Sequence, residues 1–225
     1  MPDAPKFTVE FGKDAPPHED GRLDAAAFHR NYEAIAPVLE AFLQDRSGDV
    51  LEIGSGTGQH AVAFAERLPS IAWWPTDLND NHLRSVAAWR THTRLGNVQA
   101  PVRLDASAPD WRLPALGLPS TFTAIFCANV IHIAPWEMAE GLFAGAGRHL
   151  TAEGRLWLYG PFKRDGQHNA PSNAAFDESL RARDPAWGVR NTADLKKLGA
   201  ANGLRFIELV EMPSNNAILV FAKGT

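Results

Sequence analysis

Three glycines separated by small polar residues stand at Gly54, Gly56 and Gly58, and the acid Glu52 precedes them by two positions. Glycine permits a positive φ in a tight turn and lets the backbone approach a ligand with no Cβ in the way. An apolar run, residues 49–54, leads into this loop, and a helical pattern follows it. The unpaired N–H groups of that helix start favour negative charge. The motif therefore predicts a loop that binds a cofactor.

Two classes of cofactor fit this loop. Residues 56–61 fit the looser form of the dinucleotide fingerprint, G-x-G-x-x-G/A. Residues 52–58 fit the pattern E/D-x-G-x-G-x-G at every position, which resembles the first motif of class I S-adenosylmethionine-dependent methyltransferases. The resemblance implies S-adenosylmethionine as the cofactor, and a strand acid suits its ammonium and sulfonium groups. Asp77 ends the next apolar run, 19 residues beyond Gly58, and can bind both ribose hydroxyls of an adenosine in either cofactor. The nicotinamide cofactor therefore stays open as the alternative.

Candidate residues for the acceptor side follow two later apolar runs. Asn129 lies at the end of the run 122–130, His132 follows it, and Tyr159 lies in the run 155–160. His132 is the candidate general base, because an unperturbed imidazole titrates near pH 6.5; a packed histidine between two isoleucines is the structural alternative. Asn129 could turn its side chain or carbonyl towards the methionine ammonium or an acceptor amine, and Tyr159 could wall an acceptor pocket.

The connection 161–190 is long for a compact domain, and such loops are often lids, although a structured surface excursion is equally compatible with it. Phe162 could wall the acceptor pocket, whereas Lys163 could line it or be solvated. Further candidates in this connection are Ser172, Asn173, Trp187 and Arg190.

Short apolar segments alternate with helical patterns along most of the chain. This alternation predicts an α/β protein with a parallel sheet covered by helices on both faces. The last two predicted strands, 204–212 and 216–223, are separated by three residues, which only an antiparallel pair allows. We therefore expect a Rossmann-like, seven-stranded mixed sheet that closes with an antiparallel hairpin. The five preceding strands are expected at residues 49–54, 71–77, 100–105, 122–130 and 155–160.

Several helix ends can be predicted from local signals. Asp24 is a candidate N-cap for the first helix, and Pro37 either kinks that helix or starts a second one. Asn191 is a candidate cap for a later helix that Gly203 would end. In the helix that follows Asp77, one apolar face is expected to contain Leu83, Val86 and Ala87.

Composition limits the class of protein. The 225 residues carry a net charge of -4 and no Lys/Arg run, which argues against a nucleic-acid partner. The single cysteine, Cys127, excludes an internal disulfide framework, and the scattered histidines predict no metal site. The sequence shows neither a signal peptide nor an apolar run of the roughly 18 residues that a membrane span needs, so we expect a cytoplasmic protein. Residues 1–21 read as an irregular arm and residues 22–225 as a single domain.

The pattern around the glycines resembles the first motif of class I S-adenosylmethionine-dependent methyltransferases. The stretches "WWPTDLN", "FCANVIHIAPW", "LYGPFK" and "SNAAFDESLRARDPAWGVRN" are similar to successive motifs of the methyltransferase-like protein 26 family. This resemblance runs from about Arg30 to the C-terminus. Relatives often have Glu-Arg-Asn before the first helix, where this chain has His29-Arg30-Asn31.

The resemblance implies methyl transfer from S-adenosylmethionine to a small-molecule or peptide acceptor. In the superfamily, an acid at the position of Asp105 meets the adenine amino group, and the next residue, Ala106, supplies a backbone N–H. An oxidoreductase of Rossmann type and a non-catalytic adaptor that keeps the fold are the alternatives. The residues expected to hold the cofactor are Glu52, Gly54, Ser55, Gly56, Gly58, Asp77, Leu78, Asp105, Ala106 and Asn129.

Overall fold

The computed structural model describes residues 16–224 of the chain. It divides into two compact units, which are described separately below. The first unit comprises Met1–Asp105 and Leu113–Phe122, and the second comprises Ala106–Arg112 and Thr123–Thr225. Most of the predicted irregular arm, residues 1–15, lies outside the described residues.

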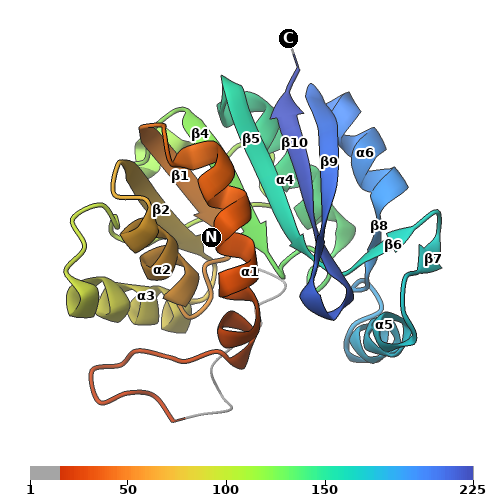
Figure 1. Ribbon diagram of the computed structural model, residues 1–225, viewed down its shortest axis with the longest axis horizontal. Coiled ribbons are helices and arrows are strands. Elements are labelled where there is room, and N and C mark those ends of the chain that lie inside the picture. Colours follow the sequence, from red (N-terminus) through yellow and green to blue (C-terminus); the bar gives the residue numbers. More distant parts are fainter. Residues whose placement is uncertain (1–15, 225) are drawn as a thin grey trace, which may run out of the picture. The chain divides into compact units, whose positions relative to one another are not determined.

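Six α-helices form in the described part of the chain (Figure 1). Two short 3-10 helices, Leu113–Leu116 and Pro213–Asn215, complete the helical elements there. The α-helices are α1 (Ala26–Leu43), α2 (Gln59–Arg67), α3 (Asp80–Thr93), α4 (Trp136–His149), α5 (Pro171–Arg183) and α6 (Thr192–Ala201).

The larger sheet has seven strands in the order β3-β2-β1-β4-β5-β10-β9, which confirms the predicted mixed sheet. β10 pairs antiparallel with both β5 and β9, so the predicted C-terminal antiparallel pair is also confirmed. The strands are β1 (Gly48–Ile53), β2 (Ile71–Asp77), β3 (Val102–Arg103), β4 (Phe122–Ala128), β5 (Leu150–Gly160), β9 (Leu204–Met212) and β10 (Asn216–Lys223).

In the first unit, β2 pairs in parallel with β1 and β3, and α2 packs against β2, α1 and α3. Val50, Leu51 and Trp73 from the two central strands are fully buried, as are Ile35 and Phe64 from α1 and α2. Each such side chain stabilises the fold by about 1.5–3 kcal/mol relative to an exposed one. This core fixes the carboxyl ends of β1 and β2, where the glycine loop and Asp77 lie.

Two predictions for the first helix need correction. Ala25, not Asp24, is the N-cap of α1 and no side chain caps it, because the Asp24 carboxylate binds His29 Nε2 at 2.8 Å instead. Pro37 does not start a second helix, since α1 runs through it to Leu43. A proline in a helix interior removes one hydrogen bond, and the buried apolar face of α1 offsets this cost.

The buried face of α3 also differs from the prediction. Val86 is buried as expected, but Ala87 is exposed and Leu83 only half-buried. The other buried positions are polar, His82 and Ser85. Apolar periodicity cannot reveal a helix face that buries polar groups, and this face contacts the glycine loop.

In the second unit, the long connection 161–190 is structured. Besides α5 it contributes a second, three-stranded sheet in the order β7-β6-β8, made of β6 (Phe162–Arg164), β7 (Gln167–His168) and β8 (Arg190–Asn191). The sequence did not predict these strands because two or three residues carry no periodicity. Asn191 is the N-cap of α6, as predicted, but its side chain makes no capping hydrogen bond and accepts one from Gly166 N–H instead. Gly203 follows the C-cap of α6 with φ +72°, as predicted.

Candidate functional site

The glycine loop after β1 adopts a backbone that depends on glycine. Gly54, Gly56 and Gly58 have φ values of 70°, 55° and 90°. A Cβ on Gly58 would lie 2.8 Å from Val86 Cα, closer than side chains tolerate. Ser55 N–H donates to Thr76 O at 2.8 Å, so the loop is tied to the end of β2. The loop is therefore held tightly, and its glycine positions cannot accept larger residues without strain.

Asp77 lies directly against this loop. Its Oδ2 accepts a hydrogen bond from Gly56 N–H at 2.9 Å, and its Oδ1 accepts one from Asn79 N–H at 2.8 Å. His82 Nδ1 lies 3.3 Å from the same Oδ1. The structure thus brings together the glycines and the acid that the sequence paired, with Leu78 half-buried beside them. Sequence reasoning missed His82, because a lone histidine in a helix gives no signal.

Glu52 is buried, with 2% of its surface exposed, and accepts a hydrogen bond from Trp73 Nε1 at 2.8 Å. Burial raises the pKa of Glu52 to about 7, while hydrogen bonds from Trp73 and Ser55 oppose the rise and the charge of Asp77 adds to it. A carboxyl group with such a pKa is drawn into its ionised form by a neighbouring cation. A bound ligand that carries an ammonium or a sulfonium would therefore shift Glu52 to its ionised form.

Asp105 and Ala106 follow β3 and are described in different units. Asp105 is half-buried. In the second unit, Ala106 is buried and its carbonyl accepts a hydrogen bond from Trp111 Nε1 at 3.2 Å. A Cβ on Gly141 would lie 2.2 Å from the same carbonyl, so α4 packs closely on the backbone of Ala106. The roles predicted for these two residues stay predictions.

The second unit brings together the three residues predicted for the acceptor side. Asn129 has a left-handed backbone (φ 58°), and its N–H donates to Tyr159 O at 2.9 Å. A Cβ on Gly160 would lie 3.3 Å from His132 Nδ1 and 3.7 Å from Asn129 Oδ1. Asn129, His132 and the Tyr159 backbone therefore surround Gly160, and the glycine leaves both side chains room. Asn129 pays a backbone strain that non-glycine residues accept mainly at special sites.

His132 is buried, and its ring meets Phe176 edge-on with centroids 5.5 Å apart. Burial, with a smaller contribution from the charge of Arg190, lowers the pKa of His132 to about 4. The imidazole is therefore neutral at pH 7 and a weak base. Arg190 holds the loop that carries His132. Its Nε donates to Ile131 O at 2.9 Å, and its Nη2 donates to Ala134 O.

Asp177 of α5 is the centre of a charged cluster that sequence reasoning missed. Its Oδ2 lies 2.6 Å from Lys163 Nζ and 3.2 Å from His168 Nε2. Its Oδ1 lies 3.2 Å from Arg181 Nε and accepts a hydrogen bond from Val189 N–H at 2.7 Å. We call these five groups the Asp177 cluster. Burial works against the charge of Asp177, but the hydrogen bonds from Lys163 and Val189 outweigh it and hold its pKa below the ordinary value.

The Asp177 cluster settles the position of Lys163. Its side chain is mostly buried, with 19% exposed, and its ammonium is paired with Asp177. Trp187 is buried as well, and Asn173 donates from Nδ2 to Asn215 O at 2.9 Å. Ser172 Oγ accepts a longer hydrogen bond from Asn215 Nδ2 at 3.4 Å. The residues singled out in the long connection therefore make contacts within the second unit.

Other features of the described residues bear on the type of site. Among residues 16–224 there is no group of three or more His, Cys, Asp or Glu side chains that could hold a metal ion. No helix in that part of the chain is long and apolar enough to cross a membrane. A groove of about 400 Å³ in the first unit is lined by α1, α2 and α3, including Tyr32, Gln59 and Trp89. None of the predicted cofactor residues lines this groove.

A family model described as "Protein of unknown function (DUF938)" matches residues 22–223 of the chain. The match covers nearly the whole sequence. It does not carry the name of the methyltransferase-like protein 26 family, so that finer resemblance stays a prediction.

Solved structures of methyltransferases share the fold. An O-methyltransferase family 2 protein from Planctomyces limnophilus, in complex with apigenin, is 16% identical with a TM-score of 0.72, over 86% of this chain and 56% of that one. The O-methyltransferase NcsB1 from neocarzinostatin biosynthesis, in complex with S-adenosylmethionine and 2-hydroxy-5-methyl naphthoic acid, is 18% identical with a TM-score of 0.69, over 88% and 54%. This chain therefore spans little more than half the length of either protein.

A third solved structure is closer in length. Magnesium protoporphyrin IX methyltransferase (ChlM) from Synechocystis, with bound S-adenosylhomocysteine, is 14% identical with a TM-score of 0.65, over 86% of this chain and 82% of that one. At these identities the likeness establishes a methyltransferase fold. The reaction and the residues that carry it need arguments from this chain itself.

Proposed function

We propose that this chain, which belongs to the DUF938 family of proteins of unknown function, is an S-adenosylmethionine-dependent methyltransferase. The observation that carries the proposal is the contact between Asp77 and the glycine loop, in which the carboxylate at the end of β2 accepts Gly56 N–H at 2.9 Å. An acid in this position beside a glycine-rich turn is suited to a ribose. The fold shared with proteins solved with S-adenosylmethionine or S-adenosylhomocysteine supports the choice of cofactor.

The chain's residues fit this cofactor. The loop glycines leave the backbone of residues 54–58 open to close approach, and Glu52 is a buried carboxyl group with a pKa of about 7 that a methionine ammonium would ionise. We assign the methionine part to Glu52 and the loop, and the ribose to Asp77. The remaining assignments, adenine contacts from Asp105 and Ala106, follow the family resemblance. We further assign a cofactor contact to Leu78 and a contact with the methionine ammonium to Asn129.

When bound, S-adenosylmethionine supplies a methyl group activated by a sulfonium, which an acceptor atom attacks in line. The chain can lower the barrier by positioning alone, since a near-attack arrangement is worth about 7–11 kcal/mol. His132, neutral at pH 7, can accept a hydrogen bond from an acceptor N–H or O–H. Its pKa of about 4 makes it a poor general base, so orientation of the acceptor is the role that we assign to it. Asn129 and Tyr159 are the other two residues that we assign to the acceptor side of the site.

A nicotinamide-dependent oxidoreductase is the second candidate, because residues 56–61 fit the looser dinucleotide fingerprint. The common dinucleotide-binding sheet has the order 3-2-1-4-5-6. Here an antiparallel strand, β10, stands between β5 and β9. This topology favours the methyltransferase. A non-catalytic adaptor would keep the same fold and loop, and only turnover separates it from an enzyme.

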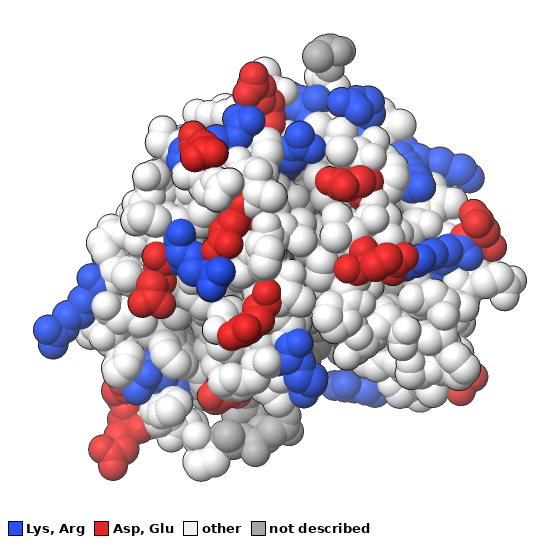
Figure 2. Space-filling view, in the orientation of Figure 1, with Lys and Arg blue, Asp and Glu red and all other residues white. Residues whose placement is uncertain are grey.

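The acceptor is proposed to be a small molecule or a peptide. Figure 2 shows Lys and Arg interspersed with Asp and Glu over the face in view, with no broad basic area of the kind that nucleic acid needs. The net charge of -4 agrees with this. The buried single cysteine, Cys127, is compatible with the reducing cytoplasm that we propose as the location. We also propose that the chain is a member of the methyltransferase-like protein 26 family and that residues 22–225 form a single domain.

Calorimetric titration of the purified protein with S-adenosylhomocysteine, and separately with NAD, tests the proposal. The demethylated product is used because it cannot turn over. We expect micromolar binding of S-adenosylhomocysteine and none of NAD. Binding of NAD alone would favour the oxidoreductase, and binding of neither would favour the adaptor.

A further inference from the structure

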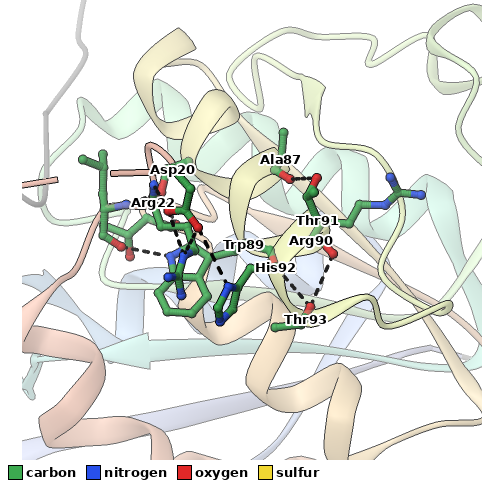
Figure 3. A network of polar contacts seen from close by, with 11 residues as sticks. Asp20, Arg22, Ala87, Trp89, Arg90, Thr91, His92 and Thr93 are labelled. Atoms are coloured by element: carbon green, nitrogen blue, oxygen red, sulfur yellow. Dashed lines mark hydrogen bonds and ion pairs between the residues drawn. The ribbon is translucent and has the colours of Figure 1, made fainter. Parts of the chain in front are cut away.

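A short segment before α1, residues 18–25, lies along α3 in the first unit and is hydrogen-bonded to it. We call this segment the strap. It begins with a hydrogen-bonded turn, in which His18 N–H donates to Arg22 O at 2.9 Å and Gly21 N–H donates to His18 O at 2.8 Å. Figure 3 shows the outer fastening, where the Arg22 guanidinium lies 4.5 Å from the Trp89 ring centroid and binds Asp20 at 2.8 Å. His92 Nδ1 lies 3.8 Å from Asp20. The strap therefore follows the surface of α3.

The inner end of the strap is held by backbone hydrogen bonds. Trp89 Nε1 donates to Leu23 O at 2.9 Å, and Leu23 N–H donates to Ser85 Oγ at 2.8 Å. Ala25 N–H donates to Gln59 Oε1 at 2.7 Å. Ser85 and Gln59 are buried, so these two N–H groups are the strap's points of entry into the interior of the first unit.

Both of these points lead to Thr57, the residue between Gly56 and Gly58. Ser85 Oγ donates its hydrogen to Thr57 O at 2.7 Å, and Thr57 Oγ1 donates to Gln59 Oε1 at 2.9 Å. Thr57 is itself buried. The two side chains that receive the strap are thus the two that hold the backbone carbonyl and the hydroxyl of Thr57. Two separate relays connect the strap to the glycine loop.

We infer that the strap forms part of the cofactor site, with Ser85 and Gln59 as positioning residues that transmit its state to the glycine loop. Ser85 has one hydrogen, already given to Thr57, so it meets Leu23 as an acceptor. Gln59 Oε1 receives Thr57 and Ala25 together. When the strap detaches, Ser85 Oγ and Gln59 Oε1 each lose a hydrogen-bond donor. These two side chains are then less fixed in orientation, and so is Thr57, which they hold. The loop is then less ordered for binding.

This inference rests on the proposed function, because it assumes that the loop binds S-adenosylmethionine or its product. Thermodynamic linkage requires the coupling to act in both directions. If a seated strap strengthens cofactor binding, the bound cofactor must strengthen the seating of the strap by the same factor. The ion pair between Asp20 and His92 leaves room for such a response. Both side chains are about half exposed, and exposed ion pairs contribute little to stability.

Trp89→Phe tests the inference, because it keeps an aromatic ring beside Arg22 and removes the indole N–H that binds Leu23 O. Trp74→Phe is the matched control: it deletes an indole N–H that donates to Asp49 at 2.6 Å, off the strap, in the same unit. Calorimetry should show S-adenosylhomocysteine binding weakened at least about fivefold in Trp89→Phe, the lower end of allosteric couplings. In Trp74→Phe the affinity should stay within about twofold of the wild type.

The reciprocal experiment uses wild-type protein alone and needs no variant to fold. Saturating S-adenosylhomocysteine should slow hydrogen exchange of the Leu23 and Ala25 amides at least about fivefold. Tight binding without that protection, or with equal affinities in both variants, overturns the inference and leaves the proposed function standing. If the wild type does not bind S-adenosylhomocysteine at all, the proposed function fails and the inference falls with it.

Discussion

The glycine loop of the first unit and the Asp177 cluster of the second unit each contain a buried carboxylate, but the two carboxylates have different partners. Asp77 is satisfied mainly by backbone N–H groups within a few residues of two strand ends, Gly56 and Asn79. Asp177 is satisfied by two cationic side chains, a histidine and the Val189 N–H, drawn from residues 163–189. The first arrangement leaves a backbone cradle, whereas the second uses charge to fix a connection.

The difference teaches where function and stability should separate. Replacing the Asp77 side chain should reduce ligand binding more than stability, because the backbone of the glycine loop is also held by Ser55 N–H and by the packing of Gly58 on Val86. A buried charge with several partners has the opposite profile, because removing it leaves several groups uncompensated. The predictions below test this separation, from the largest expected effect to the smallest.

Asp177→Ala should lower the free energy of unfolding by about 3–5 kcal/mol, the cost of removing one partner from a buried ionic group. Lys163 and Arg181 would lose their counter-charge, and Val189 N–H its acceptor. Urea denaturation measures the effect. Glu211→Ala is the control, since it breaks an exposed pair with Arg164 and should cost within about 1 kcal/mol. Equal losses in the two variants would contradict the special position of Asp177.

Gly58→Ala should destabilise the fold by about 2–5 kcal/mol. Alanine would be held at φ +90°, which costs about 1–2 kcal/mol, and its Cβ would overlap Val86, which costs about 1–3 kcal/mol more. Gly117→Ala is the matched control, because its φ is +77° but nothing lies within 4 Å of the added Cβ. It should show the backbone cost alone. If both variants lose the same stability, the packing of α3 on the loop is not as tight as described.

Two buried titratable groups, Glu52 in the first unit and His132 in the second, should respond to pH in opposite directions. Glu52 holds its proton more tightly in the folded state, with a pKa of about 7 against 4.5, so its contribution to stability falls as pH rises from about 4.5 to about 7. His132 holds its proton less tightly when folded, with a pKa of about 4 against 6.5, so its contribution falls as pH drops from about 6.5 to about 4. Each shift corresponds to at most about 3 kcal/mol.

Glu52→Gln and His132→Asn separate these responses. Relative to the wild type, Glu52→Gln should gain stability as pH rises from about 4.5 to about 7, and His132→Asn should gain it as pH falls from about 6.5 to about 4, each by up to about 3 kcal/mol. Urea denaturation at a series of pH values measures both. An unchanged pH dependence in either variant would show that the corresponding side chain does not titrate as described.

Asp77→Ala should weaken binding of S-adenosylhomocysteine by about 1–3 kcal/mol, or about 5- to 150-fold, because the ribose hydroxyls and Gly56 N–H lose their acceptor. Asp80→Ala is the control, since Asp80 is exposed and paired with Arg103. Calorimetry on both variants gives the comparison. Unchanged affinity in Asp77→Ala would remove the ribose assignment.

The contact between the glycine loop and Asp77 could be predicted from the sequence for a physical reason. The three glycines lie within residues 54–58, and the parallel strands β1 and β2 end at the same edge of the sheet, so local patterns carry the information. The Asp177 cluster joins residues from β6, β7 and α5 whose pairing no spacing announces. The strands β6–β8 are too short for periodicity, and the buried face of α3 is polar, so His82 and Ser85 could not be found from apolar pattern. The strap's link to Thr57 likewise depends on tertiary hydrogen bonds alone.

The most direct test of the central claim, that the loop of residues 54–58 together with Asp77 binds the S-adenosyl group, is an NMR titration. Amide spectra of ¹⁵N-labelled protein would be recorded with increasing S-adenosylhomocysteine. The account predicts that the largest shifts fall on Gly54, Gly56, Gly58 and Asp77, with smaller shifts at Leu23 and Ala25. Saturable shifts confined to the groove lined by Tyr32 and Trp89, or no shifts at any concentration, would contradict it.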